Sequence, residues 1–220
     1  MPVSLPYQPP LHIGLDILFE DKDIVVVNKP SGLLSVPGRG IDKQDCMLSR
    51  LQLEYPTALT VHRLDMPTSG IMIFALNKNM QKLLGILFEK RNIHKQYIAR
   101  VYGALSEKSG IINQPLITDW PNRPKQKIDY KTGKPSITKF HRLSTDNNSS
   151  MIQLQPVTGR SHQLRVHMSS LGHPILGDKL YGIYQSRTAS DRLLLHAEKL
   201  SFMHPVTDHK IEIICKADFT

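Results

Sequence analysis

The segment His62–Gly70 carries an aspartate close to an arginine on a short turn between two apolar runs, Ala58–Val61 and Ile71–Leu76. Loops held by rigid strands are where catalytic groups tend to lie, which draws attention to Asp65 and Arg63. A carboxylate is anionic at neutral pH and can attack carbon without a separate general base. Asp65 is therefore a candidate nucleophile, although an ordinary structural turn aspartate fits the local chemistry equally well.

A second polar segment, Thr158–His167, gathers two arginines and two histidines. Ser161 is predicted to cap a helix over residues 162–171. Such a cap would leave free backbone N–H groups beside Arg160, ready for a phosphate. Arg165 lies four residues after Ser161 on this helix.

Two other features are weaker signals of chemistry. Gly172–Gly182 contains three glycines, which favours tight turns or a close approach of the backbone to a ligand. Tyr97 lies in the alternating run 96–103, which is typical of a strand. A tyrosine in a strand is more often a core residue with a solvated hydroxyl than a catalytic group.

The charge balance narrows the class of partner. Lys and Arg number 28 against 19 Asp and Glu, a formal net charge of +9. Such a field favours polyanions such as nucleic acid, although a basic surface kept for solubility is the alternative. The apolar runs are far shorter than the roughly 20 residues that span a bilayer. The first residues also lack the pattern of a secretory signal, so we expect no membrane attachment and a cytoplasmic protein.

The sequence argues against metals and common cofactors. Cys46 and Cys215 are only two and far apart, which is typical of thiols in a reducing compartment. No His-Glu-x-x-His pattern or cysteine cluster occurs, and no glycine loop of the ATP or dinucleotide type. A serine-centred nucleophile elbow is also missing. We therefore expect neither a metal nor a cofactor.

Hydrophobic periodicity predicts an α+β fold with a largely antiparallel mixed sheet flanked by helices and loops. Strands are expected at 17–19, 24–27, 58–61, 71–76, 96–103, 151–157, 192–197, 199–203 and 210–215. Helices are expected at 42–55, 78–90 and 162–171. The proline-rich residues 1–15 are predicted to form an irregular arm. The basic stretch 119–135 is predicted to be a long surface loop.

Five segments together resemble the RluA family of pseudouridine synthases, over about residues 21–215. They are Asn28–Gly32, His62–Gly70, Lys95–Ala99, Thr158–Arg165 and Gly177–Gly182. The loop Trp120–Gln126 resembles the branch from which the family takes its name. Other members carry an N-terminal RNA-binding domain of the S4 type, and too few residues precede Asp21 for one. We therefore expect residues 1–220 to form a single catalytic domain.

The resemblance implies isomerisation of uridine in RNA to pseudouridine. The N-glycosidic bond breaks, the base turns, and a C–C bond forms to the same ribose. It implies that Asp65 is the nucleophile, that Tyr97 packs against the target base, and that Arg165 pairs with Asp65. Leu195 would help to wall the pocket, and Leu194 is nearly as good a candidate. Because the reaction is redox-neutral and releases nothing, it needs no cofactor.

The resemblance also implies the substrates, namely uridine 32 in the anticodon stem-loop of tRNA and uridine 746 in a stem-loop of 23S rRNA. The target base must leave its stack, at a cost of a few kcal/mol. Arg63 is placed to enter the RNA as the base departs. Arg123, Lys125 and Arg160 are candidates for phosphate contacts, and His162 for RNA binding. A monomer is the default expectation.

The sequence leaves alternatives open. Asp65 could attack the sugar carbon, attack the pyrimidine ring or promote elimination, and we favour the sugar. A non-catalytic RNA-binding protein would suit the charge, but it gives no reason for an acid amid basic motifs. A carboxylate-nucleophile hydrolase is the other candidate. Glycosidases usually need two facing carboxylates, and the other motif acid, Asp178, lies in a glycine-rich turn.

Overall fold

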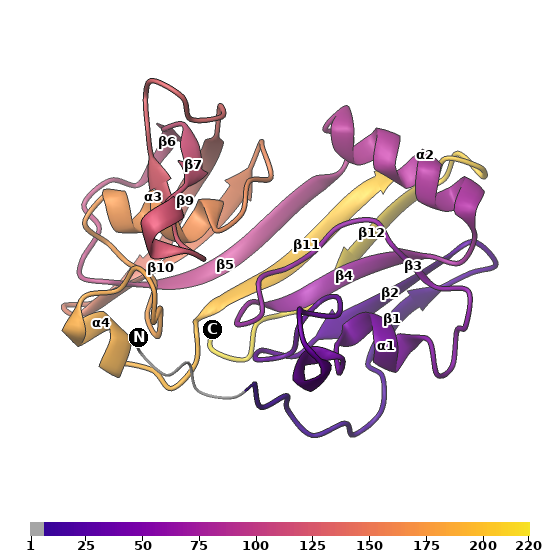
Figure 1. The fold of residues 1–220 in the computed structure, drawn as a ribbon. Helices are drawn as coiled ribbons and strands as arrows, with labels where there is room; N and C mark the ends of the chain where they lie inside the picture. The colour runs from indigo at the N-terminus through magenta and orange to yellow at the C-terminus, as the bar shows by residue number, and fades with distance from the viewer. Residues whose placement is uncertain (1–6) are drawn as a thin grey trace. The chain divides into compact units, whose positions relative to one another are not determined.

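The computed structural model describes residues 7–220, which divide into two compact units. The first unit holds the chain up to Ile93 together with Ser201–Cys215. The second holds His94–Leu200 together with Lys216–Thr220. Strands dominate both units, helices are few, and the pairing is mostly antiparallel (Figure 1). The predicted α+β class is confirmed.

The first unit is built on strands that pair antiparallel in the order β1-β2-β4, with β3 also on β4. These strands are β1 (Ile17–Glu20), β2 (Ile24–Lys29), β3 (Leu59–Thr60) and β4 (Ser69–Ala75). The pairing of β2 with β4 runs from Ile24 opposite Ala75 to Lys29 opposite Gly70. One end of this pair therefore carries the β1–β2 turn, and the other carries the Asp65 turn.

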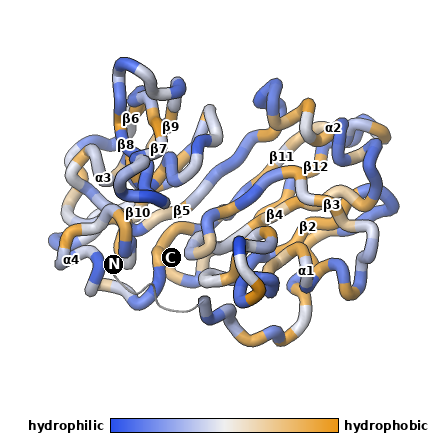
Figure 2. Tube along the Cα trace, in the orientation of Figure 1, coloured by the Kyte–Doolittle hydropathy of each residue, from blue (hydrophilic) through white to orange (hydrophobic). Residues whose placement is uncertain are grey.

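Both central strands of this unit are apolar almost throughout (Figure 2). Every residue of β4 is buried, which is the pattern of a strand covered on both faces. The helical elements of the unit are η1 (Ile41–Lys43), α1 (Met47–Leu51) and α2 (Lys78–Glu89). Helix α2 begins where the Asn77 side chain accepts a hydrogen bond of 2.8 Å from the Met80 N–H, and it buries Met80 and Leu84.

The second unit contains an antiparallel sheet in the order β5-β10-β9-β6 and a separate pair, β7-β8. Its strands are β5 (His94–Tyr102), β6 (Ser109–Asn113), β7 (Leu116–Thr118), β8 (Gln126–Ile128), β9 (Ile137–Thr145) and β10 (Ser149–Pro156). Its helical elements are η2 (Trp120–Asn122), α3 (Gln163–Ser170) and α4 (Tyr184–Thr188). Strand β11 (Leu195–Met203) runs from this unit into the first, where β12 (Lys210–Ile214) pairs with it.

Four expected elements differ from the structure. The helix expected over 42–55 is only α1, because Cys46 and Ser49 form a capping box that begins the helix at Met47. The two strands expected between 192 and 203 are the single strand β11. The loop expected over 119–135 contains η2 and β8. Strands β6, β7 and β9 and helix α4 were not predicted from the sequence.

The irregular N-terminal arm falls partly outside the described residues, at 1–6. Residues 7–16 form neither helix nor strand. The Tyr7 hydroxyl donates to the Asp45 carbonyl at 3.0 Å and accepts from the Leu34 N–H at 2.9 Å. Between residues 7 and 220, none of the helices has the length and apolar character needed to cross a membrane.

Candidate active site

Asp65 lies on the turn that joins β3 to β4 in the first unit. The Thr68 N–H donates to the Asp65 carbonyl at 3.0 Å and closes the turn. The Asp65 side chain is partly buried, whereas Arg63 is exposed. Gly70 has a φ of 110°, a backbone conformation that L side chains rarely adopt, as the chain enters β4.

Two serines from the segment after β2 form hydrogen bonds to the backbone at both ends of this turn. The Ser35 hydroxyl donates to the Leu64 carbonyl at 2.7 Å and accepts from the Leu64 N–H at 3.1 Å. The Ser31 hydroxyl donates to the Pro67 carbonyl at 2.7 Å. The residues on either side of the Asp65–Met66 pair are thereby fixed through their main chain.

The Met66 carbonyl receives two further bonds from the same segment. The Gly32 N–H donates to it at 2.9 Å, and the Lys29 ammonium donates at 3.1 Å. Lys29 also donates to the carbonyls of Pro30 and Leu33, at 2.8 and 2.7 Å. Three acceptors match the three hydrogens of an ammonium group.

Lys29 is fully buried, at 0% exposure. Burial lowers the pKa of its ammonium group to about 7, and the charge of Asp65 acts in the opposite direction. Lys29 is therefore a cation of the first unit whose charge is coupled electrostatically to Asp65.

In the second unit, Tyr97 and Leu195 belong to one apolar cluster. Tyr97 lies on β5 opposite Leu154 and packs against the buried core of that unit. Leu195 begins β11, is 3% exposed and is part of this core, whereas Leu194 is partly exposed. Their predicted roles toward a target base remain predictions, because Asp65 belongs to the other unit.

Arg165 lies on α3, is 3% exposed and makes a two-pronged ion pair with Asp178. Its Nε and Nη2 donate to the two carboxylate oxygens at 2.8 and 2.7 Å. The structure thus adds Asp178 as a partner that sequence reasoning did not assign. The pairing of Arg165 with Asp65 stays a prediction.

Asp178 is itself 1% exposed. Burial alone would raise the pKa of its carboxyl group, but Arg165 and the N–H groups of Leu180 and Tyr181 outweigh burial and lower it. The anionic carboxylate therefore fixes both the guanidinium of Arg165 and the backbone of the following turn.

The start of α3 corrects the predicted cap. His162, not Ser161, precedes the helix, with a left-handed φ of 54° and no side-chain cap. The side chain of Gln163 turns back instead, and its Oε1 accepts from the Arg160 N–H at 3.0 Å and the Thr158 hydroxyl at 2.7 Å. The Arg160 N–H is therefore paired within the protein, and the predicted phosphate contact beside Arg160 stays a prediction.

The predicted RNA-binding cations differ in exposure. Arg63, Arg123 and Arg160 are exposed, and Lys125 is partly buried. The Arg123 guanidinium lies 4.4 Å from the centroid of the Trp120 ring, which is 65% exposed. This stack places a cation and an aromatic surface together on the loop between β7 and β8.

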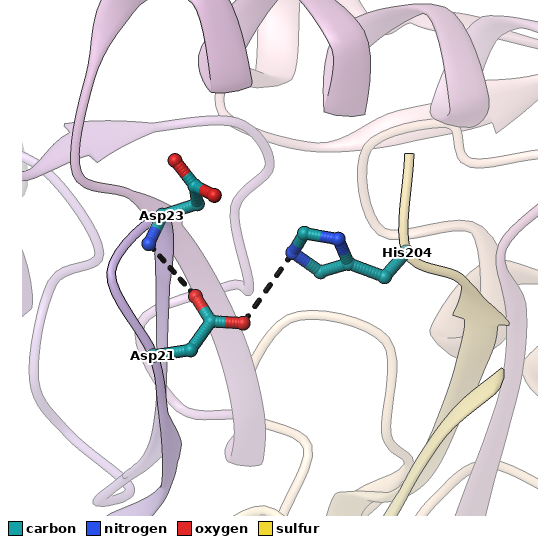
Figure 3. Close-up of side chains that lie close together, drawn as sticks. All are labelled: Asp21, Asp23 and His204. Carbon is teal, nitrogen blue, oxygen red and sulfur yellow. Dashed lines mark hydrogen bonds and ion pairs between the residues drawn. The ribbon is translucent and has the colours of Figure 1, made fainter. Parts of the chain in front are cut away.

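Asp21, Asp23 and His204 place their ligand atoms within 4.8 Å of one another (Figure 3). The His204 Nδ1 accepts from the N–H groups of Val206 and Thr207, at 3.3 and 3.1 Å. The neutral ring therefore carries its hydrogen on Nε2, which faces Asp21 at 3.4 Å. A metal-bound histidine donates from its other ring nitrogen, which Nδ1 cannot do here. We interpret the cluster as a structural contact between the β1–β2 turn and the β11–β12 turn.

Comparison with known proteins identifies the family. Residues 23–170 match the family described as RNA pseudouridylate synthase. The chain is 50% identical over 214 residues to the dual-specificity RNA pseudouridine synthase RluA of Escherichia coli K12, covering 97% of this chain and 98% of that protein. The RluA of Vibrio parahaemolyticus is 50% identical over 220 residues, covering 98% of this chain and 88% of that protein.

Solved structures agree with this match. The human RNA pseudouridylate synthase domain containing 1 superposes with a TM-score of 0.78 at 30% identity, covering 97% of this chain and 87% of that one. The chain therefore belongs to the RluA family of pseudouridine synthases. It is an RNA isomerase that forms pseudouridine.

Sequence reasoning missed Lys29, Ser35 and Asp178 as supports of the site. The signal for Lys29 was a lysine that continues the buried run of β2 directly before Pro30. The signal for Asp178 was an acid within the glycine-rich segment that also contains Tyr181. Ser35 carries no signal in the local sequence.

Replacing Lys29 with Met is expected to destabilise the fold. The three carbonyls would lose their buried donor, which we expect to lower the free energy of unfolding by about 1–3 kcal/mol near pH 8. The folded pKa of about 7 lies below the ordinary lysine value. The unfolded chain therefore binds more protons in between, so the stability advantage of the wild type should grow as the pH rises above 7. Urea unfolding at pH 7, 8 and 9 measures this.

Lys22→Met, at an exposed position of the β1–β2 turn, is the matched control and should leave stability unchanged. A wild-type advantage over Lys29→Met that does not vary between pH 7 and 9 would contradict the lowered pKa.

Asp178→Ala is expected to cost about 3–5 kcal/mol of unfolding free energy, because it leaves the buried Arg165 guanidinium without its counter-charge. The lowered pKa of the Asp178 carboxyl means that this contribution is present above the ordinary carboxyl value and is lost as the pH falls through the lowered one. Chemical denaturation at pH 7 provides the measurement. Asp191→Ala, at an exposed aspartate, should be neutral. Equal stability of the two variants would show that the ion pair contributes nothing.

Proposed function

We propose that this enzyme isomerises uridine 32 of tRNA and uridine 746 of 23S rRNA, with Asp65 as the nucleophile. The single observation that carries the mechanism is the way in which the Asp65 turn is held. The Lys29–Ser35 segment makes hydrogen bonds to the main-chain atoms of Leu64, Met66 and Pro67 in this turn. The fold thus fixes the backbone of the turn that presents the Asp65 carboxylate.

A carboxylate held in this way suits a covalent step. Attack of Asp65 on the sugar carbon would release the base from its N-glycosidic bond and hold the ribose as an ester. The base turns and forms the new C–C bond through its C5 atom while the ester to Asp65 breaks. C5 then loses its hydrogen as a proton to solvent, and N1 takes up a proton from solvent. Atoms and electrons balance without an oxidant, a metal or a second substrate.

The remaining roles follow from the chemistry of the side chains. Tyr97 would stack on the flipped base, Leu195 would wall the pocket, and Arg165 would balance the charge of Asp65. Arg63 is exposed, and it makes no ion pair within the described part of the chain, which supports its entry into the gap left by the base.

The surrounding cations suit a stem-loop substrate. Arg123, Lys125, Arg160 and His162 would contact RNA, and the formal net charge of +9 favours a polyanion. Unpaired loops are the usual targets of sequence-specific recognition in RNA, and they lower the cost of flipping a base. The name of the bacterial relatives, dual-specificity synthases, supports two substrates. We propose that the enzyme acts as a monomer in the cytoplasm, within a single catalytic domain.

Asp65→Asn is expected to lower turnover by about a thousandfold or more, because an amide cannot act as the nucleophile. Affinity for the stem-loop should stay close to wild type. Tritium release from RNA labelled at uridine C5 measures turnover, and filter binding measures affinity. Asp42→Asn, at an exposed aspartate, is the control and should be fully active. Wild-type turnover by Asp65→Asn would remove this residue from the mechanism.

The substrates are tested by mapping pseudouridine in tRNA and 23S rRNA from cells with and without the gene. We expect pseudouridine to disappear at tRNA position 32 and 23S position 746, and to return when the gene is restored. Mass spectrometry of the nucleosides should show an unchanged mass at each site. Loss at only one site would refute dual specificity, and free uracil would indicate a hydrolase.

A further inference from the structure

The Tyr181 hydroxyl joins two segments of the second unit that are far apart in sequence. It lies 2.7 Å from the backbone N of Gln126, at the start of β8, and 2.7 Å from the His162 Nδ1, before α3. A hydroxyl has one hydrogen to donate and two lone pairs to accept with. Because the Gln126 N–H can only donate, the hydroxyl accepts from it, and the tautomer of His162 sets the direction of the second bond.

The backbone of Tyr181 is held by the same group that holds Arg165. The Asp178 carboxylate accepts from the Tyr181 N–H at 3.1 Å, and the Ser169 hydroxyl of α3 donates to the Tyr181 carbonyl at 3.0 Å. The Arg165 guanidinium carbon lies 5.1 Å from the centroid of the Tyr181 ring. The position of the Tyr181 ring is thus tied to that of Arg165.

Tyr181 contacts the loop between β7 and β8 through the Gln126 N–H. This loop keeps its shape through its own hydrogen bonds. The Asp119 N–H donates to the Lys125 carbonyl at 2.9 Å and closes the loop at its base. Inside it, the Asn122 N–H donates to the Asp119 carbonyl at 2.9 Å, and the Lys125 N–H donates to the Asn122 carbonyl at 3.0 Å. A loop closed in this way is expected to move as one piece, so a bond at its end controls its orientation.

The loop presents the exposed Trp120 ring with the Arg123 guanidinium 4.4 Å from the ring centroid. An aromatic ring offers a surface on which any unpaired base can stack, and an adjacent arginine adds charge for the phosphate. The stem-loop proposed as substrate supplies such unpaired bases.

We propose, on the basis of the function proposed above, that Tyr181 is a positioning residue. Its hydroxyl group holds the Trp120–Arg123 stack in a fixed orientation relative to Arg165, so that the stack can bind an unpaired nucleotide of the RNA. Loss of the hydroxyl therefore weakens RNA binding and leaves the chemical step in place.

The test is steady-state kinetics of Tyr181→Phe on a tRNA anticodon stem-loop. We expect KM to rise about tenfold with kcat within about twofold of wild type. Trp120→Ala should give the same pattern. The KM of the double variant should not exceed the higher KM of the two single variants, because both substitutions act through one loop. Tyr184→Phe removes the hydroxyl of an exposed tyrosine in the same part of the chain and should match the wild type.

Amide hydrogen exchange gives a readout that does not depend on turnover. The Gln126 amide should exchange faster in Tyr181→Phe than in the wild type, and Trp120→Ala should leave it protected. Should Tyr181→Phe fail to fold, Gln126→Pro removes the same hydrogen bond from the loop side, and the same rise in KM is expected.

An unchanged KM in Tyr181→Phe, or a fall in kcat with KM unchanged, would overturn the proposal. If the wild type leaves the stem-loop unmodified, the proposed substrate is wrong. In that case the dissociation constants of the wild type and Tyr181→Phe for the same RNA are measured by fluorescence anisotropy. They test the proposed contribution of the Tyr181 hydroxyl to RNA binding without turnover. Equal dissociation constants refute it, and weaker binding by the variant supports it.

Discussion

The hydrogen bonds from the Lys29–Ser35 segment to the backbone of the Asp65 turn are the constraint on which the first unit depends. The pairing of Lys29 with Gly70 brings the end of β2 beside the start of β4, so the segment after one strand meets the turn before the other. Lys29, Ser31 and Ser35 then reach carbonyls of the turn. These contacts go to main-chain atoms and therefore fix the backbone of the turn that carries Asp65.

The buried lysine shows what this arrangement costs. Burial lowers the pKa of the Lys29 ammonium group to about 7, so the folded chain holds that charge less readily than water does. Three carbonyl acceptors and the nearby Asp65 offset part of the cost. A serine or a backbone amide could fix one carbonyl each, but only an ammonium group supplies three donors from one point.

In the second unit, a buried ion pair orients a candidate functional side chain, whereas the first unit uses hydrogen bonds to the backbone. Replacing a buried ion pair by apolar groups is often neutral or stabilising, so the Arg165–Asp178 pair is better understood as an orienting device than as a source of stability. Asp178 takes two bonds from the guanidinium and two from the amides of the following turn. One carboxylate thereby sets the direction of an arginine and the course of the chain that leads to Tyr181.

The sequence by itself determined the elements whose signals are local. Helix α2 was predicted because its apolar residues recur at helical spacing, and β2 and β4 because their apolar runs are uninterrupted. It also determined the family, since five ordered motifs lie along one chain. Only the tertiary structure decided that Asp178 pairs with Arg165 and that the Ser35 hydroxyl donates to the Leu64 carbonyl. It also decided that the Gln163 side chain accepts from the Arg160 N–H. These contacts depend on strand pairing and helix packing that bring distant residues together, and no periodicity along the chain encodes which polar groups will meet there.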